Sequence, residues 1–284
     1  MDTDTKVVSL ETKQKKEAPL KTEHFPNQTQ LVGMAYQAGE IMRKAFAPGM
    51  KREWKEDHTP LTESDTTINR LVIAQLERDY PHITVIGEEE SRIVEDSEYL
   101  VLVDPIDGTI PFCQGIPAST FCISVLKNGV PIVAVIHDPY CNRTWFAEKG
   151  RGTMLNGEPV RVSEHGTLAQ STVSIMWWKG SIGNLNKVCD EIVESNAKWL
   201  NLCSVAITGG LIASGDLAAS IFPGQKAWET AAMQLLVEEA GGTATDLYGN
   251  KLVYGKDLKI PGHIMSNGPI HDDLVAMVAR ANLT

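Results

Sequence analysis

The spacing of hydrophobic positions along the chain changes twice, and each spacing predicts a different kind of element. From residue 31 to residue 45 apolar side chains recur every three or four positions, which is typical of a helix with one buried face, and Pro48-Gly49 ends this run. A second run of the same period follows Asp65 and ends near Tyr80-Pro81. The sequence therefore predicts two amphipathic helices in its first part.

The pattern then becomes short runs rich in β-branched residues, which are typical of strands. These runs cover residues 83–86, 99–103, 121–126 and 132–136. Asn128-Gly129 and Asn156-Gly157 lie where two positive φ angles are needed, so both predict tight hairpin turns. We expect the first half to be helices followed by an antiparallel sheet.

After about residue 163 predicted strands and helices alternate. Strands are expected over 171–176, 199–203 and 217–222, and helices up to about 195, over 206–213, over 229–240 and over 270–281. This alternation indicates an α/β layer. We therefore divide the chain into a flexible polar tail (1–26), an N-terminal helix and antiparallel-sheet half (27–163) and a C-terminal α/β half (164–284).

The composition of the chain excludes several classes of partner but says little about the fold. The 284 residues are 43% hydrophobic and 22% charged, as in ordinary globular proteins, and 36 acidic against 26 basic side chains give a net charge of -10. This charge disfavours nucleic-acid polymers and anionic membranes as partners. Five scattered cysteines predict neither disulfides nor a zinc site, and no apolar stretch or signal pattern indicates a membrane or an exported protein. We expect a cytoplasmic protein.

The most informative segment follows the apolar run 101–103. Asp104 and Asp107 stand three residues apart, with Pro105 between them and Gly108 after them. Because proline fixes a turn and glycine frees the backbone, this segment aims both carboxylates at one point. Taken alone, the same pattern is equally typical of a strand-end turn in which Asp107 caps the next helix.

Three more carboxylates lie at ends of predicted elements. Glu88 follows a strand, Asp65 precedes a helix, and Glu229 opens a long apolar helix. Each has a structural explanation by itself, as a solvated charge run, a helix cap or a helix-dipole partner. Gathered together, they would cost several kcal/mol per buried charge without cations. Oxygen ligands alone favour magnesium or manganese, and two such ions about 4 Å apart can clamp a phosphoryl group.

Three motifs, in this order and at these separations, resemble the inositol monophosphatase family of magnesium-dependent, lithium-sensitive phosphomonoesterases. The motifs are Gly87-Glu88-Glu89, Asp104-Pro105-Ile106-Asp107-Gly108-Thr109 and Trp228-Glu229-x-Ala231-Ala232. The resemblance runs from about residue 31 to the C-terminus. It implies an α+β fold, a layered αβαβα sandwich of the type shared with fructose-1,6-bisphosphatase, and a homodimer.

The resemblance also implies two or three Mg²⁺ ions per subunit. One would be held by Glu88, Asp104 and the carbonyl of Ile106, and a second by Asp104, Asp107 and Glu229. A third, weaker ion would lie beside Glu88.

Catalytic roles are implied for Glu88, Asp65 and Thr109. The Thr109 hydroxyl, held by Asp65, would orient and help to deprotonate the water that the metal activates. Backbone amides around Gly108 and Thr109 would receive phosphate oxygens. The implied substrate contacts are Lys55, Ala206 and Phe222.

Two positions depart from the family pattern. Glu229 replaces an aspartate and reaches one methylene further. Phe222 stands where inositol-specific members carry a glutamate, and a phenyl ring cannot accept hydrogen bonds from sugar-like hydroxyls, each worth about 1–3 kcal/mol when left unpaired. Myo-inositol phosphate is therefore disfavoured as the preferred substrate.

The expected function is magnesium-dependent hydrolysis of a small phosphorylated metabolite: an inositol, sugar or polyol phosphate. Histidinol phosphate and 3'-phosphoadenosine 5'-phosphate remain alternatives, because the segments 59–62 and 113–117 also suit those branches. A non-catalytic relative that binds a metal or ligand is the alternative of another class. Asp65 and Thr109, which a binding protein would not need, argue against it.

Overall fold

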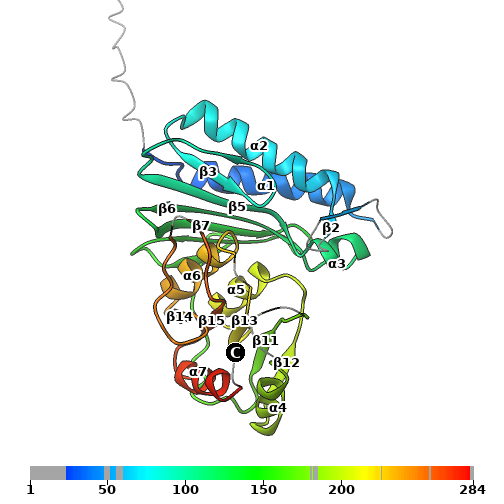
Figure 1. Ribbon diagram of the computed structural model, residues 1–284, viewed down its shortest axis with the longest axis vertical. Helices are drawn as coiled ribbons and strands as arrows, with labels where there is room; N and C mark the ends of the chain where they lie inside the picture. Colours follow the sequence, from blue (N-terminus) through cyan, green and yellow to red (C-terminus); the bar gives the residue numbers. More distant parts are fainter. Residues whose placement is uncertain are drawn as a thin grey trace, which may run out of the picture.

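The computed structural model describes residues 24–47, 52–55, 60–179, 181, 185–224, 226–255 and 257–281 (Figure 1). Residues 1–23 of the expected tail and the expected helix end at Pro48-Gly49 lie outside this part of the chain. Elements stack in five layers, with helices and sheets alternating from one end of the molecule to the other. The expected α+β, αβαβα sandwich is confirmed.

The first layer is the helix pair α1 (Gln28–Ala45) and α2 (Glu63–Asp79), which covers the outer face of the large sheet. Both helices begin before the expected positions because of their caps. Asn27 and Gln30 form a reciprocal capping box at α1, and Thr62 and Asp65 do the same at α2. Asp65 therefore lies inside the first turn of its helix rather than before it.

The second layer is an eight-stranded sheet, and its order is β10-β9-β8-β7-β6-β5-β3-β4. In chain order the strands are β3 (Thr84–Gly87), β4 (Ser91–Arg92), β5 (Tyr99–Asp107), β6 (Thr120–Lys127), β7 (Val130–Asp138), β8 (Arg143–Glu148), β9 (Thr153–Leu155) and β10 (Glu158–Val160). All pairs are antiparallel except β3 with β5. The expectation of a wholly antiparallel sheet is wrong at that pair, because the chain turns through the edge strand β4 before it enters β5.

The two expected hairpin turns are confirmed. Asn128 and Gly129 join β6 to β7 with φ angles of 49° and 74°, and Asn156 and Gly157 join β9 to β10 with 51° and 89°. Each pair supplies the two left-handed residues that let the strands keep their natural twist across a two-residue loop.

Three more layers complete the fold. Helices α5 (Ala206–Ala213) and α6 (Thr230–Glu239) lie between the two sheets, and α4 (Asn186–Glu194) and α7 (His271–Arg280) cover the far side. The second sheet has the order β12 (Lys198–Leu200), β11 (Thr172–Ile175), β13 (Ala219–Phe222), β15 (His263–Ser266), β14 (Thr243–Thr245). Short β1 (Glu53–Trp54), β2 (Pro60–Leu61) and α3 (Thr109–Gln114) stand outside the layers.

Burial on both faces explains the continuous apolar run of β5. Val101 and Val103 pack toward α1 and α2, while Leu102 packs toward α5 and α6, and all three are fully buried. This central strand is therefore fixed from both sides and carries its C-terminal acidic residues into the layer interface. No helix in the described residues is long and apolar enough to cross a membrane.

Candidate active site

A bulge at the end of β5 brings Asp104 and Asp107 to the same face. Residues three apart on a regular strand point to opposite faces. Here Asp104 pairs with Cys122 and Asp107 with Thr120, so one extra residue is inserted on β5 between the two acids. The extra residue restores their parity, and both carboxylates are nearly fully buried.

Asp107 is held at the N-terminus of α5. Its carboxylate accepts hydrogen bonds from the N–H groups of Val205 (3.0 Å) and Ala206 (2.9 Å) and from the hydroxyls of Ser204 and Thr120. Burial raises the pKa of Asp107, and these hydrogen bonds only partly oppose the rise. Ala206 was expected to contact substrate. Instead it is fully buried and its amide supports Asp107.

The chain turns sharply between Asp107 and α3. Gly108 has a φ of +83°, and a Cβ there would lie 2.7 Å from the Cβ of Ser204, so only glycine fits. Thr109 then opens α3, where first-turn amides have no intrahelical acceptor. The Thr109 hydroxyl donates to the carbonyl of Ile106 at 3.1 Å. The expected hydrogen bond from Thr109 to Asp65 is not formed between these described residues.

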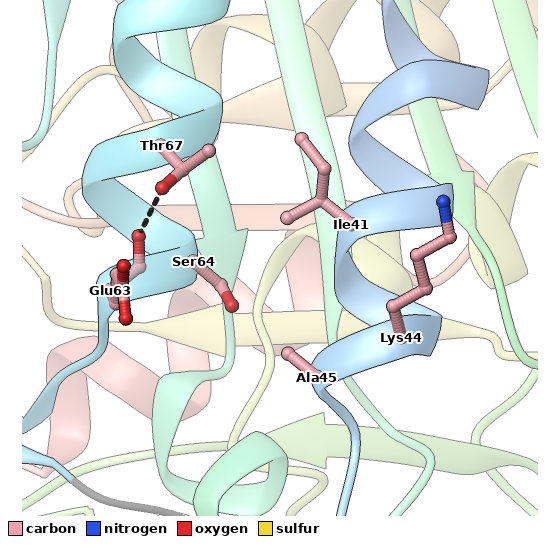
Figure 2. Close-up of a pocket in the computed structure, with 6 residues that line it drawn as sticks. All are labelled: Ile41, Lys44, Ala45, Glu63, Ser64 and Thr67. Atoms are coloured by element: carbon pink, nitrogen blue, oxygen red, sulfur yellow. Dashed lines mark hydrogen bonds between the residues drawn. The ribbon is translucent and has the colours of Figure 1, made fainter.

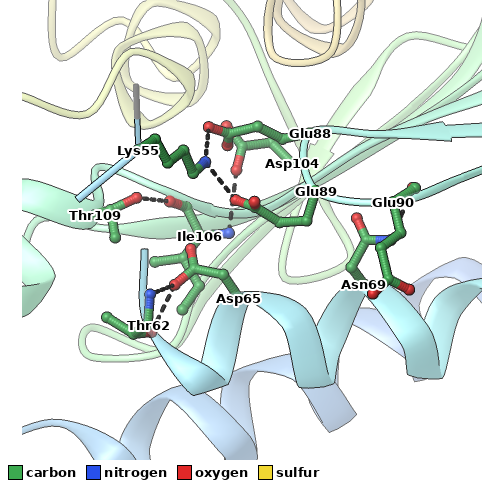
Figure 3. A network of polar contacts seen from close by, with 10 residues as sticks. All are labelled: Lys55, Thr62, Asp65, Asn69, Glu88, Glu89, Glu90, Asp104, Ile106 and Thr109. Carbon is green, nitrogen blue, oxygen red and sulfur yellow. Dashed lines mark hydrogen bonds and ion pairs between the residues drawn. The ribbon is translucent and has the colours of Figure 1, made fainter. Parts of the chain in front are cut away.

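Asp65 caps its own helix with one oxygen and leaves the other unused. Its Oδ2 accepts from the N–H (2.9 Å) and hydroxyl (2.5 Å) of Thr62, while its buried Oδ1 has no hydrogen-bond partner among the described residues (Figure 3). Burial raises the pKa of Asp65 to about 7, and the charges of Glu88 and Glu89 add to the rise. A free, buried carboxylate oxygen is thus available beside Ile106 and Glu89.

Glu88 and Glu89 both form ion pairs with the side chain of Lys55. The Nζ of Lys55 lies 2.7 Å from Oε1 of Glu88 and 2.5 Å from Oε1 of Glu89, between the two glutamates in Figure 3. Glu88 extends toward Asp104 in the same view. The backbone N–H of Glu88 donates to the carbonyl of Val103, which anchors this turn to β5. Lys55, expected near the site, therefore lies within it.

Glu229 enters from the opposite layer as the residue before α6. It is 6% exposed, and its Oε2 is buried without a hydrogen-bond partner in the described part of the chain. Burial raises the pKa of Glu229 well above its ordinary value, and the charge of Asp107 raises it further. The backbone carbonyl of Glu229 also lies 3.9 Å from the sulfur of Cys122, which pairs with Asp104.

These carboxylates influence one another strongly. After burial, the largest contributions to the raised pKa of Asp104 come from the charges of Glu88, Asp107, Glu229 and Asp65, in that order. The five acids expected from the sequence are therefore gathered from α2, the 87–90 turn, β5 and α6. Among the described residues, no group of three of these side chains is arranged so that it could hold a metal ion as it stands. Several of their oxygens accept hydrogen bonds from Lys55, Thr62 or backbone amides.

The residues nevertheless fit divalent cations. Among the described residues, one buried oxygen each of Asp65 and Glu229 lacks a partner. Burial, and after it the neighbouring negative charges, raises the pKa values of Asp104 and Glu229, so a bound cation would stabilise their ionised forms. An all-oxygen donor set is the one that Mg²⁺ prefers. Glu88, Asp104, Asp107, Glu229 and the carbonyl of Ile106 are the atoms suited to hold it.

Phe222 is a core residue at the end of β13. It is 5% exposed, and its ring centroid lies 5.8 Å from that of Trp178 and 5.4 Å from that of His263. It was expected to face substrate. In this structure its ring is covered by these aromatic neighbours, and a Cβ at Gly224 would overlap its Cε1.

A separate hollow of about 310 Å³ lies between the end of α1 and the start of α2. Figure 2 shows its lining, which is Ile41, Lys44, Ala45, Glu63, Ser64 and Thr67. None of the expected site residues lines it, so the carboxylate cluster is a different feature.

Sequence reasoning missed three residues that shape the site. Ser204 and Thr120 donate to Asp107 from distant elements, and neither carries a recognisable motif. Asn69 contacts the 87–90 turn from α2. Its polar side chain on the apolar face of a helix was the one signal that could have found it.

Comparisons with known proteins identify the family. A sequence model of the inositol monophosphatase family matches residues 26–283. A Thermotoga maritima protein named fructose-1,6-bisphosphatase/inositol-1-monophosphatase is 31% identical, covering 77% of this chain and 82% of the relative. Histidinol-phosphatase of Mycobacterium tuberculosis is 30% identical, covering 86% and 94%. A solved IMPase structure from Thermotoga maritima has a TM-score of 0.79 at 27% identity, covering 88% and 95%.

The layered fold and these similarities define the class of protein as a phosphoric monoester hydrolase. The chain belongs to the inositol monophosphatase family. This family is magnesium-dependent, and a more distant structure of the same fold (20% identity, TM-score 0.76, covering 88% of this chain and 93% of that one) is an IMPase/NADP phosphatase complexed with Mg²⁺ and phosphate.

Proposed function

We propose that the carboxylate cluster around Asp104 is the active site, where this phosphomonoesterase hydrolyses a small phosphate ester with Mg²⁺. The observation that carries the proposal is the burial of four acidic side chains with raised pKa values, Asp65, Asp104, Asp107 and Glu229, beside the half-buried Glu88. One oxygen each of Asp65 and Glu229 has no hydrogen-bond partner among the described residues. Such a cluster is unfavourable alone and becomes favourable around divalent cations.

Each residue has a role suited to its position. Glu88, Asp104, Asp107, Glu229 and the Ile106 carbonyl would hold two Mg²⁺ ions, with a third possible ion beside Glu88. When bound, these ions polarise the phosphoryl group and acidify water.

The remaining groups orient the substrate and move a proton. The amides of Gly108 and Thr109 at the start of α3 would receive phosphate oxygens. The Thr109 hydroxyl would align the attacking water, and Asp65, whose raised pKa suits proton transfer near neutrality, would accept its proton through that hydroxyl. This relay requires the Thr109 hydroxyl to leave the Ile106 carbonyl.

The substrate is proposed as a small polyol or sugar phosphate. The position where inositol-specific members carry a glutamate holds Phe222, whose ring has no acceptor and packs on Trp178 and His263, so this position does not favour myo-inositol phosphate within the class. The names of the two relatives, fructose-1,6-bisphosphatase/inositol-1-monophosphatase and histidinol-phosphatase, keep both sugar phosphates and histidinol phosphate in the set to be tested.

We also propose a homodimer in a reducing compartment such as the cytoplasm. All five cysteines are free thiols, and three of them are buried, which suits a compartment without disulfide formation. Light scattering of the purified chain tests the dimer.

The test is a panel of sugar, inositol, histidinol and nucleotide phosphates assayed for released phosphate with and without Mg²⁺, and again with lithium. Asp107→Asn should abolish turnover at saturating magnesium, because an amide cannot replace a carboxylate that both accepts four hydrogen bonds and neutralises a cation. Retained turnover would refute the ligand assignment.

The matched control is Asp138→Asn. Asp138 is an equally buried aspartate outside the cluster, where it bonds Arg143 and two turn amides. This variant should lose stability but keep the wild-type magnesium dependence. A loss of turnover in both variants alike would indicate general misfolding rather than a metal role for Asp107.

A further inference from the structure

The 87–90 turn, which carries Glu88 and Glu89, is attached to helix α2 by the buried amide of Asn69 and, at the surface, by Arg70. The Nδ2 of Asn69 donates to the carbonyl of Glu90 at 2.9 Å, and the N–H of Gly87 closes the turn onto the same carbonyl at 3.2 Å. Figure 3 shows Asn69 extending from α2 toward Glu90, to the right of Glu88 and Glu89. The Glu90 carbonyl thus accepts one hydrogen bond from within the turn and one from the helix.

Asn69 is unusual for its surroundings. It is fully buried on the face of α2 that otherwise holds Ile68, Val72 and Leu76, and its Oδ1 has no hydrogen-bond partner in the described residues. An unpaired buried acceptor destabilises the folded state. An apolar side chain would avoid that cost, so stability alone does not explain an asparagine here.

The contact is also tight in shape. Gly87 has an ordinary backbone conformation, yet a Cβ there would overlap the Oδ1 of Asn69 and lie 2.7 Å from the carbonyl of Glu90. The glycine is therefore required by close approach of the Asn69 amide rather than by its dihedral angles. The contact with the Asn69 amide therefore fixes the position of the turn on α2.

The same helix face carries a second site residue. Asp65 lies one turn before Asn69, and residues four apart share a helix face. Asp65 is fixed by its capping contact with Thr62, while Asn69 fixes the turn that holds Glu88. Helix α2 is thereby the common frame for a proposed proton acceptor and a proposed metal ligand.

We propose that Asn69 is a positioning residue of the active site, which seats the 87–90 turn on α2 and so sets where the Glu88 and Glu89 carboxylates lie relative to Asp65. It touches neither substrate nor ion. This inference rests on the proposed function of the carboxylate cluster. Groups that orient metal ligands in this way typically contribute 10- to 100-fold to metal affinity.

The test measures Mg²⁺ binding to the full chain by isothermal titration calorimetry, with magnesium chloride as the only ligand. Asn69→Ala should weaken binding by about tenfold or more. The matched control is Arg70→Ala, which removes the neighbouring contact to the same turn. Arg70 bonds Oε1 of Glu90 at 2.6 Å, but both side chains are exposed, so this loss should stay below about twofold. Equal affinities in wild type and Asn69→Ala would overturn the proposal.

Asn69→Asp keeps the side-chain volume, so it separates the loss of the amide donor from the loss of packing. It replaces the N–H donor to Glu90 by an acceptor and adds a negative charge near the cluster. If position matters, magnesium binding weakens despite that charge; if only local charge matters, binding tightens, and the proposal is wrong.

A second readout needs no metal. Hydrogen exchange of the amides of residues 87–92 should speed up in Asn69→Ala but not in Arg70→Ala, whereas general damage to α2 would instead speed exchange along residues 63–79. A wild-type chain that binds no Mg²⁺ would contradict the proposed function. A wild type that binds it and hydrolyses esters, with Asn69 variants equal to it, would contradict only the role of Asn69.

Discussion

The ammonium nitrogen of Lys55 lies 2.7 Å from Oε1 of Glu88, so a side-chain cation contacts the carboxylate that we assign to the metal. Both side chains are only 20% exposed. Burial by itself lowers the pKa of Lys55, but the charges and hydrogen bonds of Glu88 and Glu89 outweigh it and hold the pKa well above its usual value. Lys55 and a divalent cation therefore compete for the same oxygen.

This competition predicts that Lys55→Gln binds Mg²⁺ more tightly than the wild type, by roughly three- to tenfold, because a partly buried charge pair is worth about 1 kcal/mol. Calorimetric titration with magnesium checks it. Lys44→Gln, which removes a lysine from the hollow between α1 and α2, is the control and should leave the affinity unchanged. Weaker binding in Lys55→Gln would mean that the lysine supports the ion rather than opposing it.

Thr109→Ala should separate turnover from metal binding. Its hydroxyl is proposed to align the attacking water, and such groups contribute about 10²- to 10⁴-fold to the rate. We expect kcat to fall by at least 10²-fold while magnesium affinity changes by less than about twofold, and Thr109→Ser should restore most of the rate. Because Thr109 now bonds the carbonyl of Ile106, parallel losses in both quantities would place its effect on that carbonyl instead.

Magnesium should weaken the pH dependence of stability. Asp65 has a pKa raised from 3.8 to about 7 by burial, so between these values the folded state holds a proton that the unfolded state has lost. Its contribution is therefore fully present below about pH 3.8 and is lost as the pH rises through about 7. In EDTA, the free energy of unfolding should decline toward pH 8, and added Mg²⁺ should stabilise more at pH 8 than at pH 6.

Asp65→Asn isolates this effect. Two buried histidines act in the opposite direction at lower pH, because burial lowers the pKa of His137 to about 4 and that of His263 to about 3, so their contribution is lost as the pH falls below about 6.5. They are common to both proteins. In EDTA, the wild type should thus lose more unfolding free energy than Asp65→Asn as the pH rises from 5 to 8. A difference independent of pH would show that Asp65 ionises normally.

Phe222→Glu should change specificity at a cost in stability. A carboxylate there could accept hydrogen bonds from polyol hydroxyls, so the ratio of kcat/KM for myo-inositol 1-phosphate to that for p-nitrophenyl phosphate should rise. The melting temperature should fall, because the ring is 5% exposed and packs on Trp178 and His263. Phe222→Leu, which adds no acceptor, should lower the melting temperature without altering the ratio. An unchanged ratio in Phe222→Glu would show that this position does not govern specificity.

Much of the fold could be predicted from local pattern. The helix period ending at residue 45, the β-branched run 99–103 and the two Asn-Gly turns all describe preferences that act within a few residues, and the structure confirms each of them. The direction of β3 against β5 could not be predicted in this way, because strand pairing depends on how the chain returns through β4.

The same division holds for the candidate site. The sequence by itself determined which residues are candidates for the chemistry, since gathered carboxylates at the ends of apolar segments are costly unless a cation neutralises them. Glu88, Asp104, Asp107 and Glu229 are candidates on that ground. Only the tertiary structure decided where each side chain lies and what it contacts. Tertiary structure decided the bulge that puts Asp104 and Asp107 on one face and the place of Lys55 between two glutamates. It also decided the burial of Ala206 and Phe222 and the contact of Asn69 with the 87–90 turn. These contacts join different segments of the chain, and their free energies depend on distance, burial and register that no local pattern contains.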